Sequence, residues 1–483
     1  MLLLICALLP ILMGGALPFL RVRSRRLRMG YVLAVTLLTS LFALCLVFWG
    51  GEERLELFRL TDDFVCALCL DGAGRVYLAV AALLWPFAVL YAAEYMRHEK
   101  REGNFFAWYT VTYGVAVLLA GAENLFSMYI FYEFLTLCTL PLVWHEKDKP
   151  SIRAVRRYMV SLIGGAALGF VTLIGLSEMG AGNFIPGGAA IAGASPWLLW
   201  LCLMGFVGFG AKAAVFPLCG WLPSASVAPT PVTALLHAVA VVNAGIFAVL
   251  RLLYYVVPPA VIVGTWAQSA MLALSAITIL LGSAMAVREQ HLKRRLAWST
   301  VSNLSYMLFG LSLLSAEGMT AGLAHMVFHG LTKIILFFCA GAVLVQTGRT
   351  QVRQMHGLGR LMPLTFAAFT LAGMSLMGVP PLPGFVSKSA LITAAFHQGG
   401  GLQIAGAVAL LVSAVLTAVY IFTVAFPALF MKPAVAAGEA RPQDPGPCMK
   451  ITLAALCALL AAASVLAGPV MGYLNGIAGG IGL

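Results

Sequence analysis

The chain has 483 residues, of which 61% are hydrophobic and only 10% are charged. A soluble globular domain carries about 25% charged residues, so this composition excludes a soluble enzyme, a disordered chain and a nucleic-acid-binding domain. The net charge of +12 therefore has to be interpreted from where the charges lie along the chain. Length and composition together predict a membrane protein with many spans.

Apolar segments that are long enough for a membrane helix recur along the whole chain. A helical span needs roughly 20 mostly apolar residues. By this measure the sequence predicts an all-α integral membrane protein with fourteen spans. Their expected ranges are 2–20, 29–49, 75–95, 105–121, 125–144, 153–178, 197–218, 231–256, 266–286, 298–315, 320–346, 362–396, 404–431 and 449–473.

The connecting loops differ in charge. Of the 30 Lys and Arg residues, 23 fall in or beside one alternating set of loops and four in the other set. Because cytoplasmic loops are enriched in positive charge, the first set is predicted to be cytoplasmic. Both termini, and the acidic segment 52–71, are then expected outside a bacterial or archaeal cytoplasmic membrane.

Three lysines remain, and all lie within apolar spans: Lys212, Lys333 and Lys388. A lone lysine at the centre of a membrane helix costs roughly 2.5–3.5 kcal/mol on insertion scales. Ionisable groups at such positions usually face a protein interior or a wet cavity and take part in function. For Lys388, whose depth is uncertain from the sequence, snorkelling to the interface is the structural alternative.

Two spans contain clusters of proline, which a regular helix cannot accommodate. The seventh is followed by Pro217, Pro223, Pro229 and Pro231, and the twelfth contains Pro380, Pro381 and Pro383. Broken segments at corresponding places in two halves are typical of transporters with inverted repeats. We therefore expect helices 1–3 in residues 1–104, five-helix repeats in 105–256 and 257–431, and an inner loop with a last helix in 432–483.

A single acidic residue, Glu133, lies in the apolar fifth span FSMYIFYEFLTLCTLPLVW. An unpaired carboxylate there would be costly, and its natural partner is Lys212 in the broken span of the same repeat. A close opposite charge favours the charged form of both groups. The pair could therefore hold or release a proton as its separation changes, or it could be a static ion pair that orients helices.

Histidines extend this constellation. His237 opens the eighth span, and His325, His329 and Lys333 follow one another at i, i+4 and i+8 on one face of the eleventh. Histidine titrates near neutral pH and suits a proton relay, although a lone buried histidine is often only a packed core residue. No metal is expected, because two histidines at i and i+4 lack an acidic third ligand. Cys66 and Cys69 form a CxxC that indicates a disulfide or a metal only weakly.

Five stretches of the sequence resemble the antiporter-like membrane subunits of respiratory complex I, Mrp-type cation/proton antiporters and membrane-bound hydrogenases. They occur in the family's order and carry its charged residues. The stretches are YEFLTL around Glu133, GAKAAVFPLCGWLPSASVAPTPVTALLHA at 210–238, LKRRLAWSTVSNLSYM at 292–307, HMVFHGLTKIILFFCAGAV at 325–343 and GVPPLPGFVSK at 378–388.

The resemblance implies fourteen helices with two inverted repeats and discontinuous seventh and twelfth helices. It implies that Glu133 and Lys212 are a gating pair, that His237 is a relay histidine, and that Lys333 and Lys388 are the central and terminal lysines. His325 and His329 match the histidines that precede the central lysine. One departure is Asn243, in a region where Mrp-type members often carry a lysine.

The sequence thus predicts a proton-translocating subunit that works with other membrane subunits of a complex I-like, hydrogenase-like or Mrp assembly. Its transport would be coupled to redox chemistry or to Na⁺ exchange in those partners, and the chain itself would hold no cofactor. Two alternatives stay open: a self-sufficient secondary transporter for a cation or solute, and an integral-membrane acyl- or prenyl-transfer enzyme. The second requires a carboxylate-rich or metal-binding face that the sequence does not display.

Overall fold

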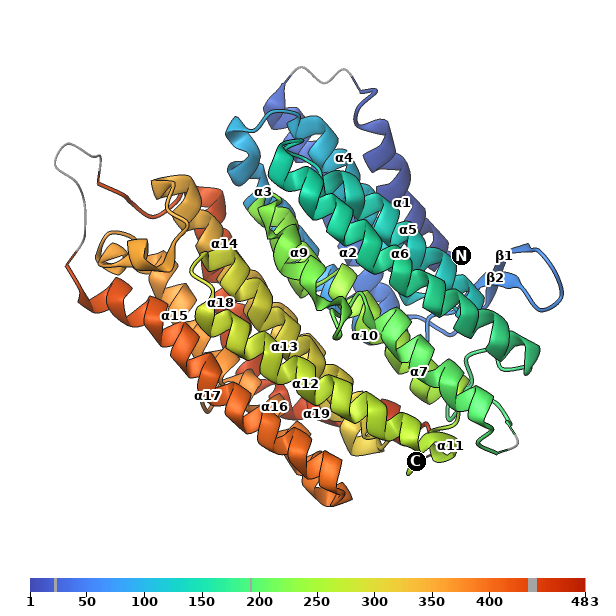
Figure 1. Ribbon diagram of the computed structural model, residues 1–483. Coiled ribbons are helices and arrows are strands. Elements are labelled where there is room, and N and C mark those ends of the chain that lie inside the picture. The colour runs from blue at the N-terminus through green and yellow to red at the C-terminus, as the bar shows by residue number, and fades with distance from the viewer. Residues whose placement is uncertain (21–23, 192, 433–440, 483) are drawn as a thin grey trace.

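The computed structural model describes residues 1–20, 24–191, 193–432 and 441–482, and it is a bundle of long helices (Figure 1). The helices are α1 (Leu2–Ala16), α2 (Arg25–Trp49), α3 (Gly72–Tyr95), α4 (Glu102–Ala120), α5 (Leu125–Val143), α6 (Lys149–Glu178), α7 (Pro196–Gly210), α8 (Trp221–Ser224), α9 (Thr230–Ala238), α10 (Val241–Arg251), α11 (Pro259–Ile262), α12 (Trp266–Arg288), α13 (Leu292–Ser312), α14 (Ala316–Thr347), α15 (Pro363–Met377), α16 (Pro383–Gln398), α17 (Gly401–Phe430), α18 (Pro447–Val465) and α19 (Ala467–Gly479).

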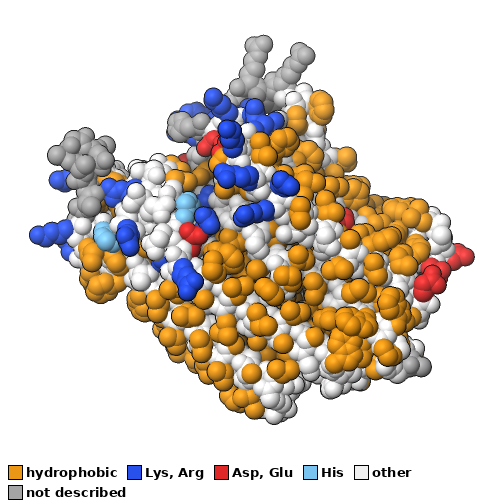
Figure 2. Space-filling view, in the orientation of Figure 1, with side chains coloured by type: hydrophobic (Ala, Val, Ile, Leu, Met, Phe, Trp, Pro, Cys, Tyr) orange, Lys and Arg blue, Asp and Glu red, His pale blue; other side chains and the backbone are white. Residues whose placement is uncertain are grey.

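Each of the fourteen expected ranges overlaps at least one of these helices. Among the described residues, ten helical segments are long and apolar enough to cross a membrane, and α1 and α7 are shorter apolar helices. Large hydrophobic side chains cover much of the face shown in Figure 2, whereas Lys and Arg gather at one end of it. The chain therefore has the surface of a multi-pass membrane protein, with an apolar belt between two polar ends.

The two ends of the bundle differ in charge, and we name them accordingly. The basic end carries the segments 97–101, 147–157, 288–295 and 349–360, which hold Lys and Arg residues. The acidic end carries the segment 52–71. Both termini lie at the acidic end, because the amino group of Met1 is 3.6 Å from Glu53 Oε2, and Ile481 packs against Gly187 in the loop before α7.

A short hairpin at the acidic end departs from the all-α expectation. Strands β1 (Leu55–Arg59) and β2 (Val65–Leu68) pair antiparallel, and β2 is buried. Asn124, which caps α5, donates from Nδ2 to the carbonyl oxygen of Val65 over 2.8 Å. In the sequence this segment is predicted to be a polar loop, because it is short and acidic. Its hydrogen bonds with the start of α5 stabilise the two strands.

Four expected spans are divided. The seventh ends at Gly210, and α8 begins only at Trp221; the twelfth is divided into α15 and α16 by a turn around Pro380 and Pro381. The eighth consists of α9 and α10, and the last of α18 and α19. Proline accounts for the first two divisions, whereas the α9–α10 break lies at Val239 and Ala240 and has no proline or glycine.

The core is centred on α14, which contacts α3, α9, α13, α15, α16, α18 and α19. Residues 228–257, which include α9 and α10, are buried without interruption. Any polar side chain on α9, α10 or the inner face of α14 is therefore enclosed by protein. Of these helices, α9 carries His237 and α14 carries His325 and His329.

Arg251, at the end of α10, links α10 to the start of α3 at the acidic end. In the sequence it counts with the less basic set of loops although it falls within the expected span 231–256, and the structure leaves its side chain only 1% exposed. Its guanidinium donates to both carboxylate oxygens of Asp71, the N-cap of α3, and lies over the rings of Phe184, Phe247 and Tyr255. The buried charge is tolerated because it is paired and surrounded by aromatic faces.

Candidate functional site

In the first half of the bundle a carboxylate and an amine lie within ion-pair distance. Glu133 is on α5, and Lys212 is in the turn that follows α7; Lys212 Nζ is 3.9 Å from Glu133 Oε1. The Lys212 side chain is fully buried, and that of Glu133 is 25% exposed. Nζ also donates to the carbonyl oxygen of Tyr132 and lies 3.2 Å from the centroid of its ring. The ammonium thus meets a charge, a carbonyl dipole and an aromatic face.

The turn that carries Lys212 is fixed by its neighbours. The indole Nε1 of Trp221 donates to the carbonyl oxygen of Ala211 over 2.8 Å, which closes the segment between α7 and α8. On the other side, α10 approaches through Gly245. A Cβ added there would lie 2.5 Å from the backbone nitrogen of Ala213 and 3.0 Å from Lys212 Cβ. Glycine therefore permits α10 to pack directly on this turn.

His237 lies one residue before the end of α9, close to the α9–α10 break. Its side chain is fully buried, and its ring centroid is 4.7 Å from that of Phe337 on α14. Neither ring nitrogen has a hydrogen-bond partner among the described residues. The break itself is held from both sides: Tyr77 donates to Ala240 O over 3.1 Å, and Asn243 Nδ2 donates to Ala238 O over 3.0 Å.

The polar ladder of the eleventh expected span lies on α14 and is buried. The rings of His325 and His329 are 5.8 Å apart. His325 bridges two other helices, because Nδ1 is 2.9 Å from Ser387 Oγ on α16 and Nε2 is 3.2 Å from Asn303 Oδ1 on α13. The ring nitrogens of His329 have no partner among the described residues.

The two lysines of the second half contact hydroxyl and carbonyl oxygens. Lys333 Nζ donates to Ser299 Oγ and, over 3.1 Å, to the carbonyl oxygen of Leu296, both on α13. Lys388 Nζ donates over 2.6 Å to the carbonyl oxygen of Leu376, at the end of α15. In the described part of the chain neither lysine forms an ion pair. Both side chains are buried, so Lys388 does not extend to the surface of this chain.

The structure brings the expected residues together in two groups. One consists of Glu133 and Lys212. The other consists of His325, His329, Lys333 and Lys388 on α14 and α16. His237 lies between them in the fold, on a helix that packs against α14. No direct hydrogen bond joins His237 to either group among the described residues; its ring contacts Phe337, one turn after Lys333 on α14.

Lys293 is a buried cation that the sequence analysis counted with a basic loop. It is only 7% exposed, and its Nζ donates over 2.7 Å to the carbonyl oxygen of Ala228, at the end of the turn that follows α8. Its burial could not be predicted, because it adjoins Arg294 and Arg295 and three adjacent basic residues indicate a loop. The helical spacing of Ser299 and Asn303 in the same apolar segment is a signal that could have identified α13 as part of the site.

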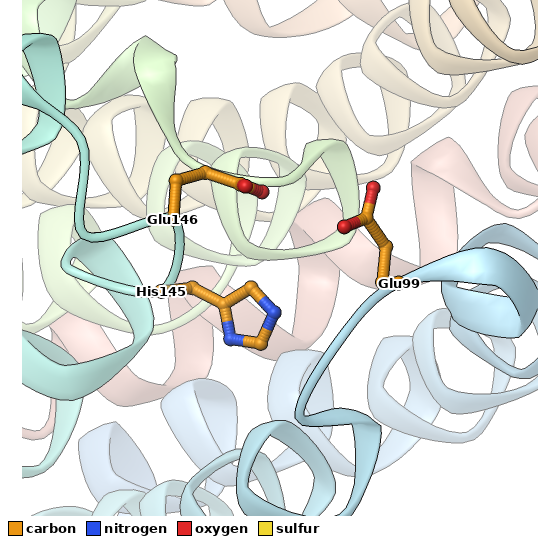
Figure 3. A group of neighbouring side chains, drawn as sticks. All are labelled: Glu99, His145 and Glu146. Carbon is orange, nitrogen blue, oxygen red and sulfur yellow. The ribbon is translucent and has the colours of Figure 1, made fainter.

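Outside the membrane-spanning helices, three side chains at the basic end could hold a metal ion (Figure 3). Glu99 follows α3, and His145 and Glu146 follow α5; their ligand atoms lie within 4.8 Å of one another. Burial lowers the pKa of His145 and raises that of Glu99, which Glu146 raises further. The donor set suits a divalent cation, but both carboxylates are exposed, and exposed acidic groups often bind no ion.

Comparison with known proteins places these residues in a family context. Residues 122–417 match the family described as NADH:quinone oxidoreductase/Mrp antiporter, TM. The chain is 33% identical over 395 residues to NADH-quinone oxidoreductase subunit N of Desulforudis audaxviator, which covers 78% of this chain and 76% of the relative. It is 27% identical over 414 residues to Na(+)/H(+) antiporter subunit A1 of Staphylococcus aureus, and this alignment covers 81% of this chain and 51% of the relative.

Among solved structures, a chain of an archaeal membrane-bound sulfane sulfur reductase complex has the same fold. The TM-score is 0.86 at 23% identity, and the alignment covers 99% of this chain and 97% of the other. The chain spans between about half and three-quarters of the length of the curated relatives it matches. The matched segment contains Glu133, the two spans that proline divides and the lysines Lys212, Lys333 and Lys388. The chain is therefore a member of the NADH:quinone oxidoreductase/Mrp antiporter transmembrane family.

Proposed function

We propose that this chain is an antiporter-like subunit that moves protons across a bacterial or archaeal cytoplasmic membrane. In this proposal it crosses the membrane fourteen times, with two inverted five-helix repeats in 105–256 and 257–431. An even number of crossings agrees with the position of both termini at the acidic end. The basic end would face the cytoplasm, since positive charge is enriched there, and both termini would lie outside.

One observation carries the proposal: titratable side chains within apolar spans are buried in both halves of the bundle. Lys212, His237, Lys333 and Lys388 are buried by protein, and Glu133 is paired with the first of them. Intramembrane ionisable groups with this placement are expected on an ion pathway. A role in rigidity alone would not require proline-broken helices beside Lys212 and Lys388.

The geometry suggests a sequence of steps. A proton reaching Lys212 is held while Glu133 stays close, because the carboxylate stabilises the ammonium. Movement of Glu133 away from Lys212 favours release of the proton toward His237. From there we propose transfer by ordered water first to a ring nitrogen of His329 and then to the amine of Lys333. The ring nitrogens of His329 are available as acceptors, because they have no partner among the described residues. Exit would follow from His325 through Ser387 to the neighbourhood of Lys388.

Other membrane subunits are the proposed partners, in a complex I-like, hydrogenase-like or Mrp assembly. Redox chemistry or Na⁺ exchange in those partners would supply the driving force, because the proposed path in this chain consists only of protein side chains. A self-sufficient secondary cation/H⁺ or solute transporter is the second candidate. It is favoured by one observation, namely that the Glu133–Lys212 pair is complete within one chain.

The test is transport by vesicles that contain the whole complex with Glu133→Gln or Lys212→Met in this chain. Since each variant removes one charge of the pair, we expect proton translocation to fall by about tenfold or more, equivalent to 1.4 kcal/mol or more. Glu317→Gln is the matched control, because Glu317 pairs with His397 at an exposed position. Unchanged translocation by a normally assembled variant complex would refute the proposal. Transport by the purified wild-type chain alone would favour the second candidate.

A further inference from the structure

A cavity of about 750 Å³ opens at the basic end between α6 and the broken segment that follows α7. Four arginines line it: Arg153, Arg156 and Arg157 on the first turns of α6, and Arg294 on α13. The three residues on α6 are spaced so that they share one face of the helix. None of the described residues that line the cavity is acidic. Figure 2 shows Lys and Arg side chains gathered at this end of the molecule.

Apart from the hydroxyl groups of Ser161 and Ser224, the remaining walls of the cavity are apolar. Val160, one turn beyond Arg156 and Arg157, is 68% exposed, and Val227 on the opposite wall is 38% exposed. Pro217 and Pro223 complete this side. The cavity thus has guanidinium groups at the end that meets water and exposed hydrocarbon along its length. This combination matches an amphiphile with an anionic head, and its volume lies in the range of small-molecule sites.

Among the described residues, a neighbouring acid pairs with only one of the four arginines, Arg294. Asp148 accepts from the backbone nitrogen of Ser151 as the N-cap of α6, and Glu289 pairs with Arg294 over 3.1 Å. Arg157 donates to a neutral hydroxyl, Ser224 Oγ, over 3.2 Å. Like charges on adjacent turns of one helix repel, and a phosphate that accepts from several guanidinium groups would relieve this repulsion.

We propose that this cavity binds the phosphate headgroup of an anionic phospholipid, with an acyl chain along Val160 and Val227. Basic pockets between membrane helices at the cytoplasmic side recognise such headgroups by the same chemistry. The site is adjacent to the turn of Lys212, because Trp221 lines the cavity and donates to Ala211 O. A bound lipid would therefore hold the broken segment in the conformation described here. The proposal does not depend on proton transport by the chain.

The test measures lipid retained by the purified complex, using native mass spectrometry after exchange into phosphatidylcholine nanodiscs that contain phosphatidylglycerol. One variant is Arg153→Gln with Arg156→Gln. A second is Gly220→Phe, which adds a ring to the lining of the cavity at a residue where a Cβ would meet no atom within 4 Å. The matched control is Arg353→Gln with Lys450→Gln, two exposed residues that do not line the cavity.

We expect the wild type and the control to retain one more phosphatidylglycerol per copy of the chain than either cavity variant. The apparent affinity should fall by about tenfold or more in the arginine variant, as for the loss of a charge-assisted hydrogen bond. Equal retention by all four proteins would overturn the proposal. It would also be overturned if inorganic phosphate displaced the lipid with equal affinity, or if a photo-crosslinker at Val160 captured a neighbouring subunit instead of lipid. Because no outcome involves transport, failure here leaves the proposed function untouched.

Discussion

Lys212 in the first half of the bundle and Lys333 in the second are both fully buried, yet their partners differ. Lys212 lies 3.9 Å from a carboxylate, whereas Lys333 donates only to a hydroxyl and a carbonyl oxygen. A carboxylate can move and change how strongly the lysine holds its proton, but a backbone carbonyl is fixed. The comparison suggests that control of proton affinity resides in the first half and that the second half conducts.

Removing each lysine separately tests this comparison most strongly. We expect Lys212→Met and Lys333→Met each to lower proton translocation by about tenfold or more. Their effects on stability should differ. Lys212→Met leaves Glu133 without its partner and should destabilise the protein by about 1–3 kcal/mol, whereas Lys333→Met removes a lone buried charge and should be neutral or stabilising.

Thermal unfolding of the purified complex, together with vesicle transport, measures both effects. The double variant Glu133→Gln with Lys212→Met serves as the control, since it removes both charges and should recover stability without recovering transport. Equal destabilisation by the two single lysine variants would contradict the difference between the halves.

A second variant gives the second half the counter-charge that it lacks. Ser299→Asp places a carboxylate at the position of the hydroxyl that contacts Lys333 Nζ. An adjacent opposite charge holds the lysine in its protonated form, so we expect translocation to slow by about tenfold, with each unit of pKa shift equal to 1.36 kcal/mol. Ser299→Asn, which keeps a polar neutral group, should slow it far less. Identical rates for the two variants would argue that Lys333 does not change protonation.

The close approach of α10 to Lys212 predicts a packing effect confined to the first half. In Gly245→Ala the added methyl meets the Ala213 backbone at 2.5 Å, and overpacking of this kind costs about 1–3 kcal/mol. Gly164→Ala on α6 is the matched control, because its Cβ meets nothing within 4 Å. We expect a lower unfolding temperature and slower transport for the first variant only. A wild-type melting temperature for Gly245→Ala would show that α10 can move away from this turn.

The smallest expected effect concerns His145, outside the membrane helices. Burial lowers its pKa below the ordinary value of 6.5, so the unfolded chain binds a proton at a higher pH than the folded chain does. The contribution of neutral His145 to the free energy of unfolding is therefore complete above about pH 6.5 and decreases as the pH falls below that value. His145→Gln should flatten this dependence in thermal unfolding measured between neutral and mildly acidic pH. An unchanged slope would mean that other groups titrate in this range.

The sequence allowed much of this site to be predicted, for a physical reason. Charged residues within long apolar runs stand out, so Glu133, Lys212, Lys333 and Lys388 could be identified without a structure. The neutral side chains that contact the site are harder to identify, because a serine or asparagine in a membrane helix is common. The spacing of Ser299 and Asn303 indicates one helix face, but only the packing of α13 against α14 places that face at the site. Ser387 likewise contacts His325 only because α16 packs against α14.

Other features depend on tertiary contacts alone. The α9–α10 break contains neither proline nor glycine, and it is held by Tyr77 on α3 and by Asn243 on α10 itself. Lys293 resembles its basic neighbours in the sequence, and only the approach of the segment after α8 buries it. The hairpin of β1 and β2 forms because α5 offers Asn124 and Ser127 as hydrogen-bond partners.

Each of the four buried lysines donates to a main-chain oxygen: those of Tyr132, Ala228, Leu296 and Leu376. These acceptors belong to the peptide unit, so they persist whatever residue occupies the position. Alanine scanning would leave them in place, and related sequences could vary freely there without losing them. Side-chain substitution therefore cannot remove these hydrogen bonds to the buried cations. Amide-to-ester replacement in the backbone is the chemical change that would expose their contribution.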